Sequence, residues 1–386
     1  MSRTFDELFA TLNAGGPGAA DALHAILGMG QAAVPRLVTL ISAGRSRYLA
    51  GYLLSFVDVP DAVAMLEPLL GAPDRSVRSA AIQALGRSGD ARALQLIVDH
   101  AGADEQLAIS ALGDLGVAEG REPIVHIVRR RLGETWSAAA VRELAARAED
   151  RFDLTDLFII ARAAESLAKL GDFSLVDAAC ELTRVIPQNE ELVEALSVRL
   201  AAIDALDVSV GQGVAVALAA RLEDPSSEVA EAAARAELHL GRMRVVARWL
   251  RVFERPDGTL APVARRLLHE LVGRNPPVEA EEARAWWSKR AARYDANVCY
   301  RFGIPAAPAR LVLDARKPDG AIARGELRQM IGLPFLEATL SPPPPVEIAR
   351  LDAWWQVHAG DFPPGKLHRW GRTYAPDACD GEPRSQ

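Results

Sequence analysis

A ten-residue phrase that recurs along the chain constrains the fold more than any other feature. Residues 81–90 read Ala-Ile-Gln-Ala-Leu-Gly-Arg-Ser-Gly-Asp. Parts of the phrase return 27 and then 82 residues later, at Ala108, Ala111, Leu112, Gly113 and Gly116 and at Ala163, Leu167, Gly171 and Asp172. Small residues three apart, followed by Leu and a glycine turn, predict a helix that packs closely on a neighbour and then stops. Recurrence at about 30 residues is typical of a helical solenoid, in which each unit buries its face against the next.

The composition suits many small helix contacts better than one large core. Of the 386 residues, 49% are hydrophobic and only 6% are aromatic. Apolar stripes at helical spacing run through residues 5–273, and no long alternating pattern predicts strands. The candidate turn glycines between these stripes are Gly30, Gly89, Gly116, Gly171, Gly241 and Gly273. We therefore expect an all-α fold of stacked helix pairs.

The second helix of a pair is clearest from Asp74 onward. Asp74 is placed to cap the helix, and Val77-Arg78 follows one turn later. Here the sequence resembles the HEAT-repeat family, an armadillo-like group whose intra-repeat turn carries Asp and whose second helix opens with Val-Arg. The resemblance covers roughly residues 19–273. Within this range the repeats are similar to the short bacterial HEAT repeats of phycobilisome chromophore lyases. It implies a right-handed α-solenoid of HEAT-like helix pairs.

A second internal repeat follows this array. The pattern consists of two adjacent tryptophans, a further aromatic residue and an Arg-aromatic-Gly triplet, and it recurs at a fixed offset of 68 residues. The first copy is Ala285-Trp286-Trp287, Tyr294 and Arg301-Phe302-Gly303. The second copy is Ala353-Trp354-Trp355, Phe362 and Arg369-Trp370-Gly371. Seven matched positions without a shift in register indicate a duplicated module. We expect segments 281–310 and 349–378 to share one conformation, with a helix, a turn and a short extended stretch.

These patterns divide the chain into four parts. We predict an N-terminal helix and Gly-rich linker at 1–18, a HEAT-like repeat array at 19–275, a first Trp-Trp module at 276–348, and a second, truncated Trp-Trp module with a C-terminal tail at 349–386. The duplicated Trp-rich modules are expected to cap the solenoid at its C-terminal end, because the end of a repeat array must be covered to stay soluble.

Charge, cysteine usage and the N-terminus narrow the possible functions. The net charge of −7 makes nucleic acid an unlikely partner by bulk electrostatics. Cys180, Cys299 and Cys379 lie far apart without metal-ligand or disulfide spacing, which favours a reducing compartment. The first residues lack the pattern of a signal peptide, and no uncharged apolar run reaches the roughly 18 residues that a membrane span needs. We expect a cytoplasmic protein.

Two groups of residues are candidates for contact with a partner. The first is a positive patch, consisting of Arg121, Arg129, Arg130 and Arg131. The alternative for that patch is an ordinary solvated helix face. The second belongs to the duplicated modules, and consists of Trp287, Trp355, Arg369 and Trp370. Trp and Arg often anchor interfaces, although closure of the solenoid end is the stronger interpretation of these residues.

A further set of residues is expected to be structural: Asp74, Arg78, Gly89, Gly171, Trp286, Trp354, Gly303 and Gly371. Adjacent residues on a helix point about 100° apart, so one tryptophan of each pair can enter the core while the other lies at its edge. Asp74 and Arg78 are expected to link neighbouring repeats. The glycines permit the turns that end the helices and the modules.

No catalytic pattern emerges from the sequence. The seven histidines form no recognisable cluster, and there is no nucleophile elbow, phosphate loop or dinucleotide fingerprint. We infer no cofactor, metal or small-molecule substrate. The leading hypothesis is a non-catalytic scaffold or adaptor whose groove, lined by second helices, holds a protein partner. The alternative is an enzyme accessory or lyase-like HEAT protein, or a HEAT-type DNA-binding or repair protein, which would need a basic concave face.

Overall fold

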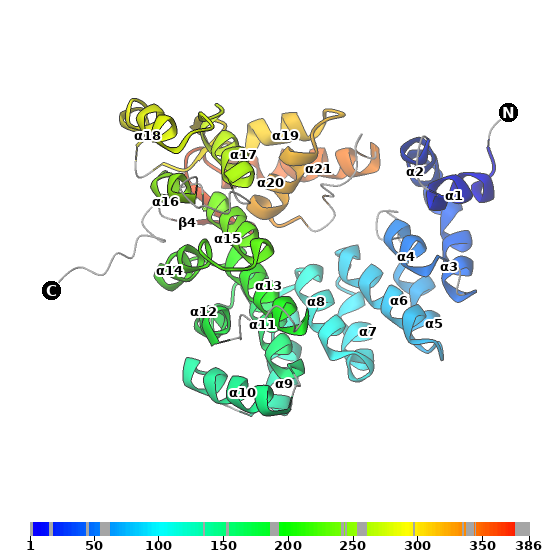
Figure 1. Ribbon diagram of the computed structural model, residues 1–386. Coiled ribbons are helices and arrows are strands. Elements are labelled where there is room, and N and C mark those ends of the chain that lie inside the picture. The colour runs from blue at the N-terminus through cyan, green and yellow to red at the C-terminus, as the bar shows by residue number, and fades with distance from the viewer. Residues whose placement is uncertain are drawn as a thin grey trace. The chain divides into compact units, whose positions relative to one another are not determined.

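The computed structural model of the chain is built almost entirely of helices (Figure 1). It describes residues 3–14, 18–43, 46–54, 62–133, 136–151, 154–185, 193–240, 243, 245–252, 261–295, 298–333, 336, 343 and 345–374. The predicted Gly-rich linker at 15–17, the turn at Gly241, most of the proline-rich stretch 341–345 and the tail from 375 onward lie outside the described residues.

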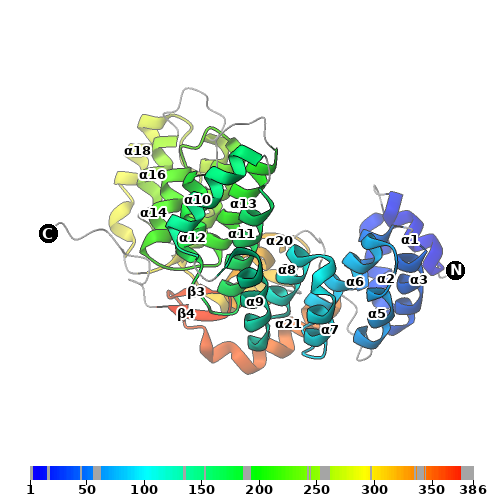
Figure 2. The ribbon, with the colours of Figure 1, turned by 90° about the horizontal axis from the view of Figure 1, so that it is seen from below.

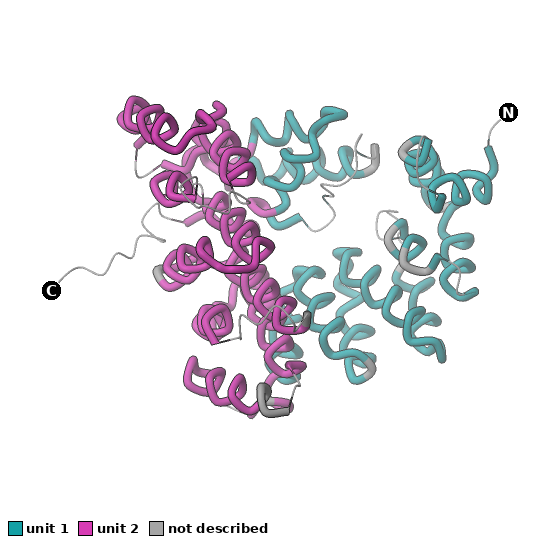
Figure 3. Tube along the Cα trace, viewed as in Figure 1, with its two compact units in different colours: residues 1–127, 309–328, 332–359 teal, residues 128–308, 329–331, 360–386 magenta. Residues whose placement is uncertain are grey.

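The chain forms two compact units, which Figure 3 shows in separate colours. Unit 1 contains residues 1–127, 309–328 and 332–359, and unit 2 contains residues 128–308, 329–331 and 360–386. This division falls within the predicted array rather than at its ends. Four elements cross it: α9 (Arg121–Leu132), α19 (Pro308–Ala315), α20 (Ala321–Ile331) and η5 (Ala359–Asp361).

Unit 1 consists of short helices that pack in consecutive pairs. Its elements are α1 (Phe5–Ala14), α2 (Ala19–Gly28), η1 (Gly30–Ala33), α3 (Val34–Ser42), α4 (Arg47–Leu54), α5 (Ala62–Leu70), α6 (Arg75–Ser88), α7 (Ala93–His100), η2 (Ala101–Ala103), α8 (Glu105–Leu115), η3 (Ala118–Gly120) and α21 (Pro345–His358). Within this unit α3 packs on α4 and α5 on α6, while the second helix α6 packs on both α4 and α8. The predicted all-α solenoid of HEAT-like helix pairs is thereby confirmed as the fold class.

Local signals in the sequence set the ends of α6. The Asp74 carboxylate accepts a hydrogen bond from the backbone N–H of Ser76, which satisfies one of the free donors of the first turn. Gly89 ends the helix with a φ of 68°, a conformation that glycine adopts without steric cost. Arg78 donates to the carbonyl oxygens of Ala72 and Pro73 and so fixes the loop that precedes the helix.

The small residues of the recurring phrase allow close approach of α6 and α8. A Cβ atom added at Gly86 would lie 2.7 Å from Cα of Ala111, so only glycine fits at this crossing. Arg75 at the start of α6 pairs with Asp104 at 2.8 Å, while Asp104 caps α8 by accepting from the N–H of Leu107. The sequence phrase therefore marks where one repeat is packed and fastened to the next.

Unit 2 stacks its helix pairs in two layers, visible in Figure 2 as neighbouring rows. The first layer is α10 (Ala138–Arg151), α12 (Val176–Val185), α14 (Gln212–Arg221), α16 (Val245–Val252) and α18 (Ala280–Ser288). The second layer is α11 (Thr155–Lys169), α13 (Val193–Asp207), α15 (Ser227–His239) and α17 (Ala261–Val272). The core between the layers is rich in Ala, Leu, Val and Ile. A buried ion pair joins α13 to the turn before α15, with Arg199 and Asp224 at 2.8 Å.

Strands occur only as two short hairpins among the described residues, and both lie in the segments expected to contain a short extended stretch. The first pairs β1 (Tyr300–Arg301) with β2 (Ile304–Pro305), and the second pairs β3 (Leu367–Arg369) with β4 (Arg372–Tyr374). Both hairpins are antiparallel and both belong to unit 2. The remaining element of this unit is η4 (Ala291–Arg293).

Candidate functional site: hairpins and surface pockets of unit 2

The two hairpins are copies of one structure. Adding 68 to the bounds of η4 gives those of η5, and the pair Arg301–Ile304 becomes Arg369–Arg372. At the turns, Phe302 and Trp370 have φ values of 52° and 42°, and the following glycines both have a φ of 77°. The offset found in the sequence is therefore also a structural offset, although the division into units separates α21 from the second hairpin.

Each hairpin turn covers the end of a helix. The N–H groups of Phe302 and Gly303 donate to the carbonyl oxygens of Glu270 and Leu271 near the end of α17. In the second copy, the N–H groups of Trp370 and Gly371 donate to the carbonyl oxygens of Gln329 and Met330 near the end of α20. These carbonyl groups lie in the last turn of a helix, where no intrahelical donor is left for them. The hairpins thus satisfy backbone groups that would otherwise need water.

The second hairpin also carries arginines to the ends of three second-layer helices. Arg372 donates to the carbonyl oxygens of Ala168 and Lys169 at 3.2 and 3.1 Å. Arg369 donates to the carbonyl oxygen of Ala236 at 3.3 Å and lies 3.5 Å from the carboxylate of Asp207. Cations are favoured at helix C-termini because the helix dipole is negative there. These contacts fasten residues 367–374 to α11, α13 and α15.

Asp207 is the centre of this charge cluster. His239 Nδ1 donates to its carboxylate at 2.7 Å. Burial alone would raise the pKa of Asp207, but His239, Arg369 and Arg301 together hold that pKa below its ordinary value. The carboxylate is therefore charged and paired, as a structural ion cluster requires.

The structure places the aromatic candidates differently from the sequence interpretation. Arg369 and Trp370, proposed as partner contacts, are only 1% and 7% exposed. Trp370 packs against Ala168 and Val208, with the Lys169 ammonium 5.0 Å from its ring centre. These two side chains are interior residues of unit 2 and offer no surface to a partner, because the turn of the hairpin directs them onto the helix ends.

The paired tryptophans are all half-buried, so the expected split, with one ring of each pair in the core and the other at its edge, does not occur. The rings of Trp286 and Trp287 lie 6.3 Å apart at 36°, and those of Trp354 and Trp355 lie 6.4 Å apart at 34°. On these short helices both rings of a pair lie across the boundary between core and solvent. Trp287 and Trp355 remain partly accessible, as a partner contact would require.

The arginine patch is exposed on α9, and part of its charge is paired. Arg121 belongs to unit 1, and Arg129, Arg130 and Arg131 belong to unit 2. Arg131 pairs with Asp156 at 2.7 Å, and the Arg129 guanidinium lies 5.9 Å from the ring centre of Trp136. The positive charge of this segment is therefore partly taken up by neighbouring side chains.

A groove in the first helix layer was not predicted from the sequence. It has a volume of about 560 Å³. Its lining comes from the start of α10, one face of α12 and the start of α14: Trp136, Ser137, Ala138, Ser174, Asp177, Cys180, Glu181, Arg184, Gly213 and Val216. The four residues from α12 follow the spacing of one helical stripe. That stripe is visible in the sequence, but nothing there indicates which helices flank it.

The groove has an apolar part and a charged rim. Val216 is 49% exposed, and Trp136 lines the same space. On the rim, Glu181 pairs with Arg142 at 3.3 Å and with Arg184 at 3.5 Å. Burial raises the pKa of the Cys180 thiol to about 11, so this thiol is protonated at neutral pH and is a poor nucleophile. The groove is thus suited to contact rather than to covalent chemistry.

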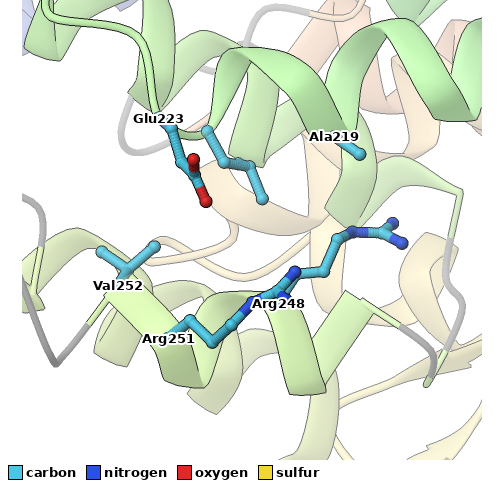
Figure 4. Close-up of a pocket in the computed structure, with 6 residues that line it drawn as sticks. Ala219, Glu223, Arg248, Arg251 and Val252 are labelled. Atoms are coloured by element: carbon cyan, nitrogen blue, oxygen red, sulfur yellow. The ribbon is translucent and has the colours of Figure 1, made fainter.

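A smaller pocket of about 300 Å³ lies between α14 and α16 (Figure 4). Glu223 lines it from the end of α14, opposite Arg248 and Arg251 on α16. Arg248 is not free to bind a ligand, because it pairs with the buried Glu237. In this pocket Glu223 therefore faces Arg248, which is already paired with Glu237, and Arg251, which is exposed.

Neither a metal centre nor a membrane span is found in the part of the chain that the structure describes. No group of three or more His, Cys, Asp or Glu residues there could hold a metal ion. None of the described helices is long and apolar enough to cross a membrane.

The comparison with protein families supports the repeat architecture. A family model of HEAT repeats matches residues 35–113, a segment that includes α6 and most of α8, and supports a HEAT-repeat protein. Among solved structures, the chain is similar to the crystal structure of an engineered protein, with 20% identity, coverage of 85% of this chain and 86% of that chain, and a TM-score of 0.31. A TM-score of this size does not establish a common fold. No curated protein matches the sequence significantly.

Proposed function

We propose that the protein is a non-catalytic interaction scaffold that binds a partner protein through the groove formed by α10, α12 and α14. The observation that carries this proposal is the exposure of Val216 in a space that Trp136 also lines. Exposed apolar side chains gathered in a concave surface favour binding of another protein's apolar side chains. A repeat array provides such a surface without any need for catalytic groups.

The rim of the groove supports a partner with an apolar contact face. Glu181 is held between two arginines, so its charge is largely balanced within the rim. Gly213 leaves the floor open, since a Cβ at this position would stand 3.7 Å from the Cys180 sulfur. An apolar side chain entering here would displace water from Val216 and Trp136.

This groove lies in the layer of first helices, whereas the sequence favoured a surface of second helices. Along the second layer, charged side chains bridge the helices, as in the pairs Arg162–Asp204 and Arg266–Glu231. Exposed pairs of this kind contribute little to binding energy when they are already satisfied. The first layer is therefore the better candidate surface.

The test is a matched pair of substitutions in the full chain. Val216→Asp places a charge in the groove, and Val357→Asp makes the same change in α21, where Val357 is 77% exposed. Both variants should keep the melting temperature, because both side chains are exposed. Val216→Asp should abolish capture of the cellular partner, while Val357→Asp should leave it intact. Equal capture by both variants would contradict the proposal, as would retention on heparin at moderate salt, which would favour nucleic acid.

We further propose a cytoplasmic location. The two cysteines within the described ranges, Cys180 and Cys299, are buried and form no disulfide bond there. Cysteines kept as thiols are typical of proteins in a reducing compartment.

A further inference from the structure

A ladder of aromatic rings extends from α18 to the first hairpin. The ring centres of Trp287 and Tyr294 lie 5.6 Å apart at 26°, and Tyr294 meets Tyr300 edge to face at 5.0 Å. Trp286 is adjacent to Trp287, and the guanidinium of Arg290 lies 4.8 Å from the ring centre of Trp286. Four aromatic rings and one cation therefore form a continuous series of contacts within unit 2, which we call the α18 ladder. Trp286, Trp287, Tyr294 and Arg290 are half-buried, and Tyr300 is buried.

The outward polar groups of the α18 ladder are hydrogen-bond donors. The indole N–H groups of Trp286 and Trp287 donate to no atom of the described chain and remain accessible. The hydroxyl groups of the ladder are already engaged within unit 2: Tyr294 donates to the carbonyl oxygen of Val272, and Tyr300 accepts from the N–H of Asp295. The ladder therefore offers flat apolar faces together with two unused donors.

A proline-rich segment has the complementary chemistry. Proline has no N–H, so such a segment presents backbone carbonyl acceptors and almost no donors. Its polyproline II conformation leaves those carbonyls unbonded and turns flat rings outward, which is the form that aromatic grooves recognise. A saccharide would bring as many donors as acceptors. An ordinary strand would bring a row of N–H groups, whereas the Tyr294 oxygen is the one side-chain acceptor that the half-buried rings of the ladder carry.

We propose that the α18 ladder binds a proline-rich segment of a partner protein, with the rings of Trp286, Trp287 and Tyr294 against proline rings and the two indole N–H groups donating to its carbonyl oxygens. The tryptophan pair is repeated in α21 with nearly the same ring separation and nearly the same angle between the rings. This repetition supports a role for the paired rings beyond packing within α18. The proposal is independent of the groove between α10, α12 and α14.

Calorimetric titration of the full chain with a decaproline peptide tests this proposal, with a Gly-Ser decamer as the control peptide. Saturable binding of decaproline alone is expected. Trp286→Phe and Trp287→Phe keep an aromatic ring and remove one donor each, and each should weaken binding about fivefold. Trp136→Phe, the same change at a half-buried tryptophan in the groove, should leave the affinity unchanged, as should Val216→Asp.

Three results would overturn the proposal. The first is no saturable binding of decaproline by a chain with native circular dichroism. The second is equal weakening by Trp136→Phe and by the two ladder variants. The third is an increase in affinity when Pro342, Pro343 and Pro344 are replaced by Gly, since that would assign the ladder to the chain's own proline-rich segment rather than to a partner.

Discussion

Arg369 and Asp207 meet inside unit 2 although 162 residues separate them in the sequence. The guanidinium is 1% exposed and also donates to the carbonyl oxygen of Ala236. With His239 on the other side of the carboxylate, the pair ties the second hairpin to the ends of α13 and α15. The hairpin is therefore part of the framework of unit 2 rather than an appendage.

Arg369→Ala should destabilise the protein by about 3 kcal/mol, because removing one partner leaves a buried carboxylate with incomplete compensation. Arg235→Ala is the matched control, since Arg235 is 46% exposed and pairs with Glu231 on the surface. That control should change the free energy of unfolding by less than about 0.5 kcal/mol. Urea denaturation of both variants provides the measurement, and equal losses would show that the hairpin does not brace the helices.

The same cluster predicts a loss of stability in acid. The pKa of Asp207 lies below its ordinary value of 3.8 in the folded chain, so its contribution is fully present above about pH 4 and is lost as the pH falls through the lower folded value. Asp207→Asn removes this titration. The difference in unfolding free energy between pH 7 and pH 3.5 should be smaller in the variant than in the wild type. An unchanged or larger difference would place the acid sensitivity elsewhere.

The stability lost when a turn glycine is replaced by alanine should depend on the atoms that surround it. Gly303 and Gly371 share a φ of 77°, but a Cβ would lie 2.5 Å from the Val272 oxygen in the first and 3.3 Å from the Ile331 oxygen in the second. Gly89 has a similar φ and nothing within 4 Å. Substitution to Ala should therefore cost about 1 kcal/mol at Gly89, more at Gly371 and most at Gly303. Thermal melts of the three variants provide the measurement. Another order of melting temperatures would contradict the backbone geometry described for these turns.

Reversing the charge of the exposed arginines should have little effect on folding. Arg129→Glu and Arg130→Glu each change an exposed side chain on α9, and such changes usually stay within about 0.5 kcal/mol. Arg199→Glu is the contrasting variant, because Arg199 is 1% exposed and pairs with Asp224; that chain should fail to fold or melt far earlier. A large loss of stability from the α9 variants would mean that this patch is structural.

Features carried by local sequence were predictable, and those that depend on distant segments were not. The glycine ends at Gly89 and Gly116 and the hairpin offset follow from residues close together in the chain. The burial of Trp370 depends on Ala168 and Val208, which are remote in sequence, so the pattern of the module alone could not reveal it. The groove is likewise made by three helices whose adjacency appears only after folding.

The half-burial of both tryptophans in each pair has a similar reason. Helical geometry predicts that Trp286 and Trp287 diverge, but it does not say how deep α18 sits against its neighbours. In the structure, Arg290 covers the ring of Trp286 while Tyr294 covers that of Trp287. The depth of each ring is thus set by residues of the following turn as much as by the helix itself.

The most direct test of the scaffold function is hydrogen–deuterium exchange of the full chain with and without its captured partner. We expect slower exchange on binding in peptides that cover residues 136–138, 174–184 and 213–216, which contain the residues that line the groove. The Val216→Asp chain should show no such change when it is mixed with the same partner. Protection confined to the second-layer helices, with the groove peptides unchanged, would contradict the assignment of the binding surface.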